Sequence, residues 1–312
     1  MNISVYDTSI SDSNLGNQII MDAVLTELYD LFPNDYIFKL PYMEITEYTL
    51  NIINSCTYSF FGGTNSLNGN LEKYTQMGIN QHNYKRIQNF ISMGMGWWQY
   101  QEKISPFSKK LLLSLFSMKI NHSVRDEYTK KKLNEIGIHN VTNTGCPTLW
   151  RLRETGYPIH KSDNVIFTIT DYNKDPIRDK AFVNILSHEY KNVYCFIQGS
   201  GDYDYLKQLN SDKNIQLLSP NLKKYDEFLE HNDVDYIGTR LHAGIRALQH
   251  MKKTLIIGID NRAFEMGKDF HLPVIIPDKI YEIPNLLKND IVLSIPYRRI
   301  EEWKMQFNRI EK

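Results

Sequence analysis

Cysteine is scarce in this chain of 312 residues, and the three that occur, Cys56, Cys146 and Cys195, lie far apart. No C-x-x-C pair is present, so the sequence indicates neither a zinc knuckle nor a framework of disulfide bonds. No run of about 18 apolar residues occurs, so we expect no segment that spans a bilayer. A G-x-G-x-x-G or Walker A motif is also missing from the first β–α turn, which argues against a phosphate loop for a dinucleotide or ATP.

An excess of one charge is absent as well, because 36 Lys and Arg residues balance 36 Asp and Glu residues. Such a chain has no overall field that attracts nucleic acid, and we expect no nucleic-acid partner. The stretch from Met1 to Asp7 has no basic region followed by a long apolar one, so no signal peptide is expected. We therefore predict a cytoplasmic protein, for which a peripheral position at the inner membrane is also compatible.

Strand-like and helix-like segments alternate along the whole chain, which predicts parallel sheets with crossover helices. The expected strands are residues 3–6, 36–40, 56–61, 90–93, 119–124, 141–144, 165–170, 193–197, 215–218, 234–237, 254–259 and 274–276. At this length two domains are expected, and the two series of strands predict two Rossmann-like domains. The predicted division is 1–150, 160–285 and a C-terminal helical tail at 286–312.

The most informative segment follows the apolar run that ends at Ile237. A Gly-Thr turn and a helix-like pattern come next, and Arg240, His242 and Arg246 lie on the turn and the first helical turns. A helix that starts after a strand presents free backbone N–H groups, which attract anions. Two guanidiniums and an imidazole there predict a phosphate or carboxylate site with a proton donor. A cluster of ion pairs that caps the helix is the structural alternative.

Two further turns lie where predicted strands end, and ligands of open parallel sheets bind at such ends. The first turn contains Asn14, Gly16 and Asn17, and its alternative role is a helix cap. The second contains Gly63, Thr64 and Asn65, where glycine allows a ligand to approach the backbone. Its alternative role is a structural turn.

With these residues in view, the chain resembles the polysaccharide pyruvyl transferase family. The resemblance depends on four segments in order: Asn-Leu-Gly-Asn at 14–17, Phe-Gly-Gly-Thr-Asn at 61–65, Ser-Val-Arg-Asp at 123–126 and Arg-Leu-His-Ala at 240–243. It implies a GT-B-like α/β fold, with two Rossmann-like domains whose parallel sheets face across a cleft. It also implies transfer of a pyruvate ketal from phosphoenolpyruvate to a sugar of a surface polysaccharide, such as capsule or exopolysaccharide, or its precursor.

By this resemblance the second domain holds the donor and the first holds the sugar or oligosaccharide acceptor, free or carrier-linked. The resemblance implies no cofactor or metal, and it is compatible with a homo-oligomer. We expect His242 to be the catalytic acid. The expected donor-binding residues are Arg125, Arg240, Leu241 and Arg246, and the expected acceptor-binding residues are Asn14, Gly16, Asn17, Gly63, Thr64 and Asn65. For Arg125 the alternative is an ion pair with Asp126 or Glu127.

The chain also departs from the family. Asn17 and Cys146 stand where many members have an aspartate, and Arg262 replaces an expected lysine, so the general base is not assigned. Two other functions stay open: a glycosyltransferase that uses Glu227 or Glu265 to bind a ribose, and a binding protein without catalysis. The aromatic residues Trp97, Trp98 and Tyr100 could stack on a sugar or belong to a core or an interface.

Overall fold

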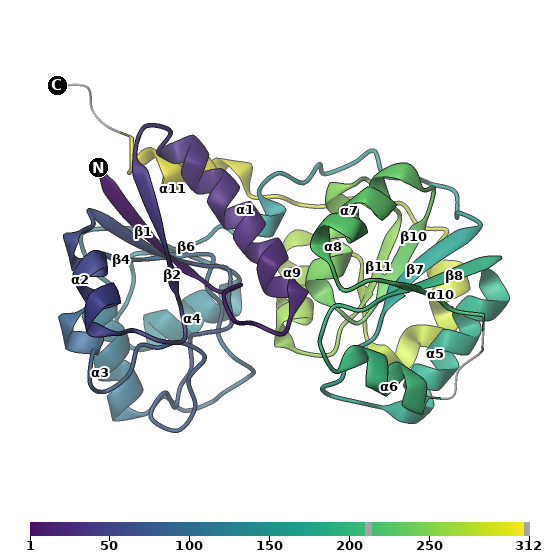
Figure 1. The fold of residues 1–312 in the computed structure, drawn as a ribbon, viewed down its shortest axis with the longest axis horizontal. Helices are drawn as coiled ribbons and strands as arrows, with labels where there is room; N and C mark the ends of the chain where they lie inside the picture. The colour runs from purple at the N-terminus through teal and green to yellow at the C-terminus, as the bar shows by residue number, and fades with distance from the viewer. Residues whose placement is uncertain (210–213, 309–312) are drawn as a thin grey trace. The chain divides into compact units, whose positions relative to one another are not determined.

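The computed structural model describes residues 1–209 and 214–308, and these form two compact units (Figure 1). Unit 1 comprises residues 1–12, 20–150 and the chain from Pro296 onward, and unit 2 comprises residues 13–19 and 151–295. Residues 309–312, the end of the predicted helical tail, lie outside the described residues.

Unit 1 contains a four-stranded parallel sheet in the order β2-β1-β3-β4 and a separate parallel pair, β5-β6. The strands are β1 (Asn2–Asp7), β2 (Tyr36–Pro41), β3 (Tyr58–Gly62), β4 (Phe90–Met93), β5 (His122–Val124) and β6 (Val141–Asn143). The helices are α1 (Leu15–Leu31), which begins in unit 2, then α2 (Glu47–Ser55), α3 (Pro106–Leu115), α4 (Glu127–Glu135) and α11 (Tyr297–Met305). Two short 3-10 helices, η1 (Tyr84–Arg86) and η2 (Pro147–Leu149), complete the unit.

Unit 2 contains a six-stranded parallel sheet in the order β12-β11-β10-β7-β8-β9. The strands are β7 (Asn164–Thr168), β8 (Asn192–Phe196), β9 (Gln216–Leu218), β10 (Asp235–Gly238), β11 (Thr254–Ile257) and β12 (Val274–Ile275). The helices are α5 (Pro176–Glu189), α6 (Asp202–Gln208), α7 (Leu222–His231), α8 (Leu241–Gln249), α9 (Asn261–Phe270), η3 (Pro277–Glu282) and α10 (Ile283–Leu286). The predicted α/β architecture with parallel sheets is therefore confirmed.

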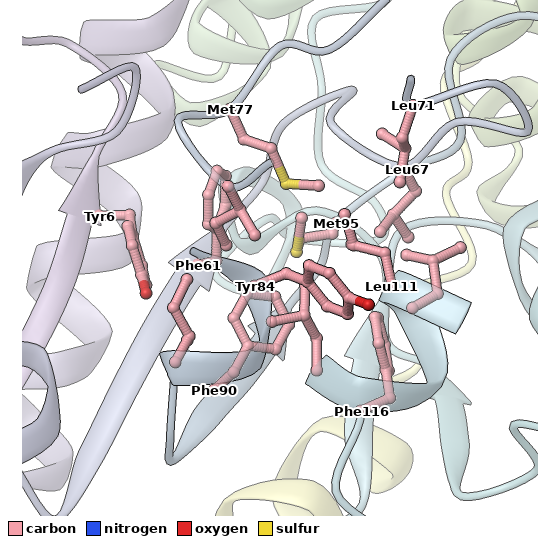
Figure 2. Packing of buried hydrophobic residues seen from close by; sticks show 14 of the residues in the cluster. Tyr6, Phe61, Leu67, Leu71, Met77, Tyr84, Phe90, Met95, Leu111 and Phe116 are labelled. Carbon is pink, nitrogen blue, oxygen red and sulfur yellow. The ribbon is translucent and has the colours of Figure 1, made fainter. Parts of the chain in front are cut away.

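The core of unit 1 is rich in aromatic side chains (Figure 2). The ring of Tyr6 on β1 stacks on Phe61 of β3 with ring centroids 4.9 Å apart, and Phe90 of β4 packs against Phe61 at 6.1 Å. These positions lie on adjacent strands of one sheet, where parallel register brings side chains of one face together. The burial of this face stabilises the sheet that carries the loops of unit 1.

The two units are not continuous stretches of sequence, which differs from the simple division that the sequence pattern predicts. Ser13 and Leu15 join unit 2 through the segment that follows its strand β8: Leu15 N donates to Gln198 O at 3.0 Å, and Ser200 N donates to Ser13 O at 3.0 Å. An antiparallel bridge between Asn14 and Gly199 lies between these bonds. The backbone of residues 13–15 thus pairs with the chain that continues β8.

The chain from Pro296 onward returns to unit 1 through α11. Trp303 is 1% exposed, packs edge-on against Phe60 and donates its indole N–H to Asn121 O at 2.7 Å. Lys304, the next residue, forms an ion pair of 2.6 Å with the buried Glu27 of α1.

Within residues 1–209 and 214–308, no helix has both the length and the apolar character that crossing a membrane requires.

We predict that Trp303→Ala destabilises the protein strongly. Removing a buried tryptophan leaves a cavity, which costs about 3–5 kcal/mol in the free energy of unfolding. Met305→Ala on the same helix is the matched control, because Met305 is 62% exposed and its loss should change stability by less than about 0.5 kcal/mol. Urea unfolding followed by circular dichroism measures both, and equal effects would contradict the prediction.

Candidate functional site

The loops that follow the parallel strands of unit 2 enclose a small polar pocket. Its lining includes residues from the segments after β7, β8, β10 and β11: Tyr172, Gln198, Arg240, His242, Asp260 and Arg262. The carboxyl ends of parallel strands lie at one edge of the sheet, which is where open α/β sheets bind ligands. The pocket therefore occupies the position that the fold provides for a site.

The start of α8 forms one wall of this pocket. Strand β10 ends at Gly238, where an added Cβ would overlap the backbone and hydroxyl of Thr168 on the neighbouring strand. The Thr168 hydroxyl accepts the N–H of Arg240 at 3.2 Å, which directs the chain out of the sheet and into α8. Arg240 stands at the N-cap position of α8, and its side chain makes no capping hydrogen bond to the first turn of the helix as the structure describes it. Its N-terminal N–H groups are consequently suited to an anionic group of a ligand.

Arg240, immediately before α8, is 3% exposed and rigidly held. Its Nε donates to Asp202 Oδ2 at 3.1 Å, and its Nη2 donates to Asp202 Oδ1 and, at 3.1 Å, to Asp171 Oδ1. The guanidinium also lies over the Tyr172 ring, 4.9 Å from its centroid. Its Nη1 makes no hydrogen bond to the residues that the structure describes, and so remains the donor for a bound group.

Asp202 is the anchor of this arginine. It is fully buried, and besides Arg240 it accepts the N–H groups of Gly199 at 2.7 Å and Asp171 at 3.1 Å. Burial raises the pKa of the Asp202 carboxyl, an effect that Arg240 and the N–H of Gly199 partly oppose. With both oxygens occupied, Asp202 is built to orient Arg240 rather than to take a proton from a substrate.

A second guanidinium reaches the pocket from α9. Asp260 caps this helix by accepting the N–H groups of Arg262 at 3.1 Å and Ala263 at 3.4 Å. The same carboxylate accepts Arg262 Nε at 3.0 Å, and Arg262 Nη2 donates to the Tyr172 hydroxyl at 2.8 Å. The position where the chain departs from the family's lysine thus supplies a pocket arginine, and Tyr172 contacts both guanidiniums.

The structure brings several of the predicted residues together. His242 and Leu241 are 5% and 6% exposed and line the same pocket as Arg240. Asn14 lines this pocket as well. Its Oδ1 accepts Gln198 Nε2 at 2.8 Å and the N–H of Gly16 at 2.9 Å. The first predicted turn therefore belongs to unit 2, although its sequence position suggests the first domain.

The pocket has no excess of positive charge. Arg240 and Arg262 face the carboxylates of Asp171, Asp202 and Asp260, so these five groups sum to one negative charge when ionised. Attraction for an anion must come from directed N–H groups, namely the start of α8 and Arg240 Nη1. This arrangement favours a small ligand of defined geometry over any anion.

Arg246 is not brought to the pocket. Its Nε and Nη2 donate to the two carboxylate oxygens of Asp226 on α7, each at 2.7 Å, and its Nη1 donates to Gln249 at 2.9 Å. His250 contacts the same aspartate at 3.3 Å. These bonds join α7 to α8 outside the pocket lining.

Arg125 lies in unit 1 and is 1% exposed. Its Nε, Nη1 and Nη2 donate to Asp126 Oδ2 at 2.9 Å, Asn65 Oδ1 at 2.5 Å and Trp97 O at 3.5 Å. An added Cβ at Gly96 would overlap this guanidinium, so the glycine makes room for it. Arg125 therefore ties together the loops after β3, β4 and β5, and its predicted contact with a donor stays a prediction.

The turn after β3 is also closely packed. Gly63 has a φ of +62°, a left-handed conformation that glycine adopts without strain, and an added Cβ would overlap Ile20. Thr64 is 8% exposed, and its hydroxyl shares a hydrogen bond of 2.6 Å with Ser66. The acceptor role predicted for this turn and for Asn17 is not tested by these contacts.

Other candidates lie outside the pocket. Glu227 forms an ion pair of 2.8 Å with Lys224 on the exposed face of α7, and Glu265 is not in the pocket lining. Cys146 is fully buried, and burial raises the pKa of its thiol. Among residues 1–209 and 214–308, no group of three or more His, Cys, Asp or Glu side chains could hold a metal ion.

The site residues that we expect from the sequence do not include Tyr172, Gln198 or Asp260. Each lies within four residues of the end of a strand, after β7, β8 and β11 respectively. Asp260 is also recognisable as a helix N-cap, because it is an aspartate directly before a helix-like segment. Listing every polar residue at a predicted strand end would have found all three.

Solved structures of low sequence identity share the fold. The Methanocaldococcus jannaschii UDP-GlcNAc 2-epimerase in complex with UDP-GlcNAc and UDP is 12% identical, covers 99% of this chain and 100% of its own, and has a TM-score of 0.58. The S. aureus MnaA–UDP structure is 13% identical, covers 100% of this chain and 98% of its own, and has a TM-score of 0.52. Their likeness confirms the predicted GT-B-like fold, with Rossmann-like domains, and shows no more than the fold. No curated protein matches the chain significantly.

The family is shown by a sequence profile. The profile described as polysaccharide pyruvyl transferase matches residues 14–261, which include the Arg-Leu-His segment at the start of α8. The same range contains the turns after β1 and β3 and the Ser-x-Arg-Asp segment before α4. On this match, together with the fold, the chain belongs to the polysaccharide pyruvyl transferase family.

Proposed function

We propose that this protein transfers the pyruvate unit of phosphoenolpyruvate to a sugar of a surface polysaccharide or its precursor, forming a ketal. The single observation that supports this most is the pocket at the uncapped start of α8, where Arg240 and His242 lie together in a member of this family. We propose that no cofactor is required.

The reaction sets the demands on the site. Two sugar hydroxyl oxygens form bonds to the enol carbon of phosphoenolpyruvate, and the bond from that carbon to the phosphate oxygen breaks. The two hydroxyl groups lose two protons in total. The methylene carbon gains one proton as it becomes a methyl group, and the departing phosphate takes up the other. No electrons are exchanged with an oxidant or reductant. The site must therefore hold an anion and deliver a proton.

The pocket residues fit these demands. Arg240 Nη1 and the first N–H groups of α8 would bind the phosphate or the carboxylate, while Asp202 keeps the guanidinium in place. His242 in the first turn of α8 would protonate the methylene carbon or the departing phosphate. Arg246 is bonded to Asp226 and Gln249 outside the pocket lining, so we assign it no direct contact with the donor. The predicted contact of Arg125 with the donor stays a prediction.

A nucleotide sugar is the second candidate donor. The reason is the fold: the two solved structures above are complexes, one with UDP-GlcNAc and UDP and the other with UDP. The partly exposed carboxylates of Asp171 and Asp260 beside the pocket arginines would also suit hydroxyl groups of a nucleotide sugar. The protein would then be a glycosyltransferase or epimerase of the same fold.

We predict that phosphoenolpyruvate raises the melting temperature of the protein and that UDP-GlcNAc does not. A ligand that binds only the folded state adds about 2.7 kcal/mol of stability at a concentration one hundred times its Kd. Differential scanning fluorimetry with both compounds, and with phosphate as an anion control, makes the comparison. Stabilisation by UDP-GlcNAc alone would favour the nucleotide-sugar reading instead.

We predict that His242→Ala lowers phosphate release from phosphoenolpyruvate by at least about a hundredfold, as expected when a general acid is removed. The measurement is phosphate release with a panel of sugar acceptors. His250→Ala is the matched control, because His250 ends the same helix and is not in the pocket lining. A rate for His242→Ala close to that of the control would remove the proposed role.

We predict that Arg240→Lys weakens phosphoenolpyruvate binding by about tenfold to a hundredfold, the value of one or two charge-assisted hydrogen bonds. A lysine cannot bind both oxygens of Asp202 and still donate to a ligand, because its ammonium is a single point of charge. Arg178→Lys is the control, since Arg178 lies in an exposed ion pair with Asp175. Calorimetric titration with phosphoenolpyruvate measures both, and unchanged affinity in Arg240→Lys would exclude the arginine from the donor site.

A further inference from the structure

Two aromatic side chains of unit 1 pack against each other in a tilted pair that is partly open to solvent. The ring centroids of Tyr74 and Trp98 are 4.4 Å apart, at an angle of 33°. Tyr74 is 42% exposed and Trp98 is half-buried. The other three tryptophans, Trp97, Trp150 and Trp303, are all buried. We call the Tyr74–Trp98 pair the aromatic platform.

The aromatic platform lies where the sheet of unit 1 ends. The segments after β3 and β4 continue side by side, since Gly96 N donates to Thr64 O and Trp98 N donates to Leu67 O, each at 2.7 Å. A parallel bridge between Leu67 and Trp97 joins the same segments. Trp98 therefore stands beyond the carboxyl ends of the parallel strands, the edge at which such sheets bind ligands.

Amide side chains hold the loops of the platform. Gln101 Oε1 accepts the N–H of Gly69 at 2.8 Å and the indole N–H of Trp97 at 2.7 Å, while its Nε2 donates to Asn68 Oδ1 at 2.9 Å. Asn68 Nδ2 in turn donates to Tyr74 O at 3.1 Å. The platform is thus fixed before any ligand arrives, which lowers the entropy cost of binding.

Polar groups stand beside the rings. Gln76 Nε2 donates to the Tyr74 hydroxyl at 2.8 Å, which leaves the Tyr74 O–H as a donor. Gln76 Oε1 makes no hydrogen bond to the described residues and is an acceptor.

We propose that the aromatic platform is a subsite that stacks against the pyranose ring of the sugar acceptor. A pyranose presents C–H groups on its faces and hydroxyls on its rim, which match exposed rings bordered by an amide oxygen and a phenol. This inference rests on the proposed function, because it takes the acceptor to be a sugar. Trp97, in the core, and Tyr100, whose ring lies edge-on to Tyr128 at 5.1 Å, are not part of the platform.

The experiment measures sugar binding without any donor, so its result is independent of phosphoenolpyruvate chemistry. The probes are methyl β-glycosides of galactose, glucose, mannose and N-acetylglucosamine, observed by saturation-transfer NMR and titrated through tryptophan fluorescence. Trp98 is the half-exposed tryptophan, so we expect a fluorescence change from it and the strongest transfer to the C–H protons of one pyranose face.

Trp98→Ala and Tyr74→Ala should each weaken the binding of the best glycoside by about tenfold, as measured by saturation transfer. Trp98→Phe should retain most of the binding, which separates loss of stacking from loss of folding. The control is Tyr281→Ala, an exposed tyrosine of unit 2 that is 71% exposed. Stabilisation of Trp98→Ala by phosphoenolpyruvate should equal that of the wild type.

Three outcomes would overturn the proposal. In the first, Trp98→Ala binds the glycosides as tightly as the wild type does. In the second, saturation transfer reaches the pyranose protons of none of the probes. In the third, light scattering shows that the wild type is a dimer and that Trp98→Ala is a monomer. In the last case a second copy of the chain covers the platform. Failure of phosphoenolpyruvate to bind the wild type, with glycoside binding intact, would instead reject the proposed donor and leave the platform standing.

Discussion

The candidate site depends on one buried ion pair, between Arg240 and Asp202. A charged guanidinium that is 3% exposed would be costly in free energy without a partner, and Asp202 supplies two oxygens to it. The pair also fixes the direction of the guanidinium, because a planar fork that meets a carboxylate in two bonds has little freedom. Asp171 and the face of Tyr172 hold the remaining sides. What is left for a ligand is one nitrogen and the helix that starts beside it.

Unit 1 contains a comparable arginine in a different setting. Arg125 also follows a parallel strand, precedes a helix and binds a buried aspartate. There, however, Asp126 caps α4 by accepting the N–H of Thr129 at 2.7 Å, and the third arm of the arginine reaches Trp97. The start of α8 has no such cap. The two arginines therefore have different roles although their sequence contexts are similar. Arg125 joins a set of loops, whereas Arg240 stands beside N–H groups that can bind an anion.

Much of the fold was predictable from the sequence, since the apolar strands and the helices between them alternate regularly. Arg240 and His242 were predictable as neighbours because a strand–turn–helix segment places them together locally. The partners of the arginines were not, because Asn65 is 60 residues from Arg125 and Asp202 is 38 residues from Arg240. Asn14 illustrates the same limit, since its contact with Gln198 spans 184 residues.

The way the chain returns to unit 1 has a consequence for biosynthesis. The aromatic cluster of Phe60, Trp303 and Phe307 joins strand β3 to α11 and the residues just after it, which are distant in the sequence. On the ribosome, β3 must wait, with part of its apolar surface open, until α11 emerges. A fragment that stops at Trp150 would keep that surface bare, and one that starts at Arg151 would lack the residues at 13–19 that extend β8. The units are thus distinct in structure while neither is encoded as a separable piece.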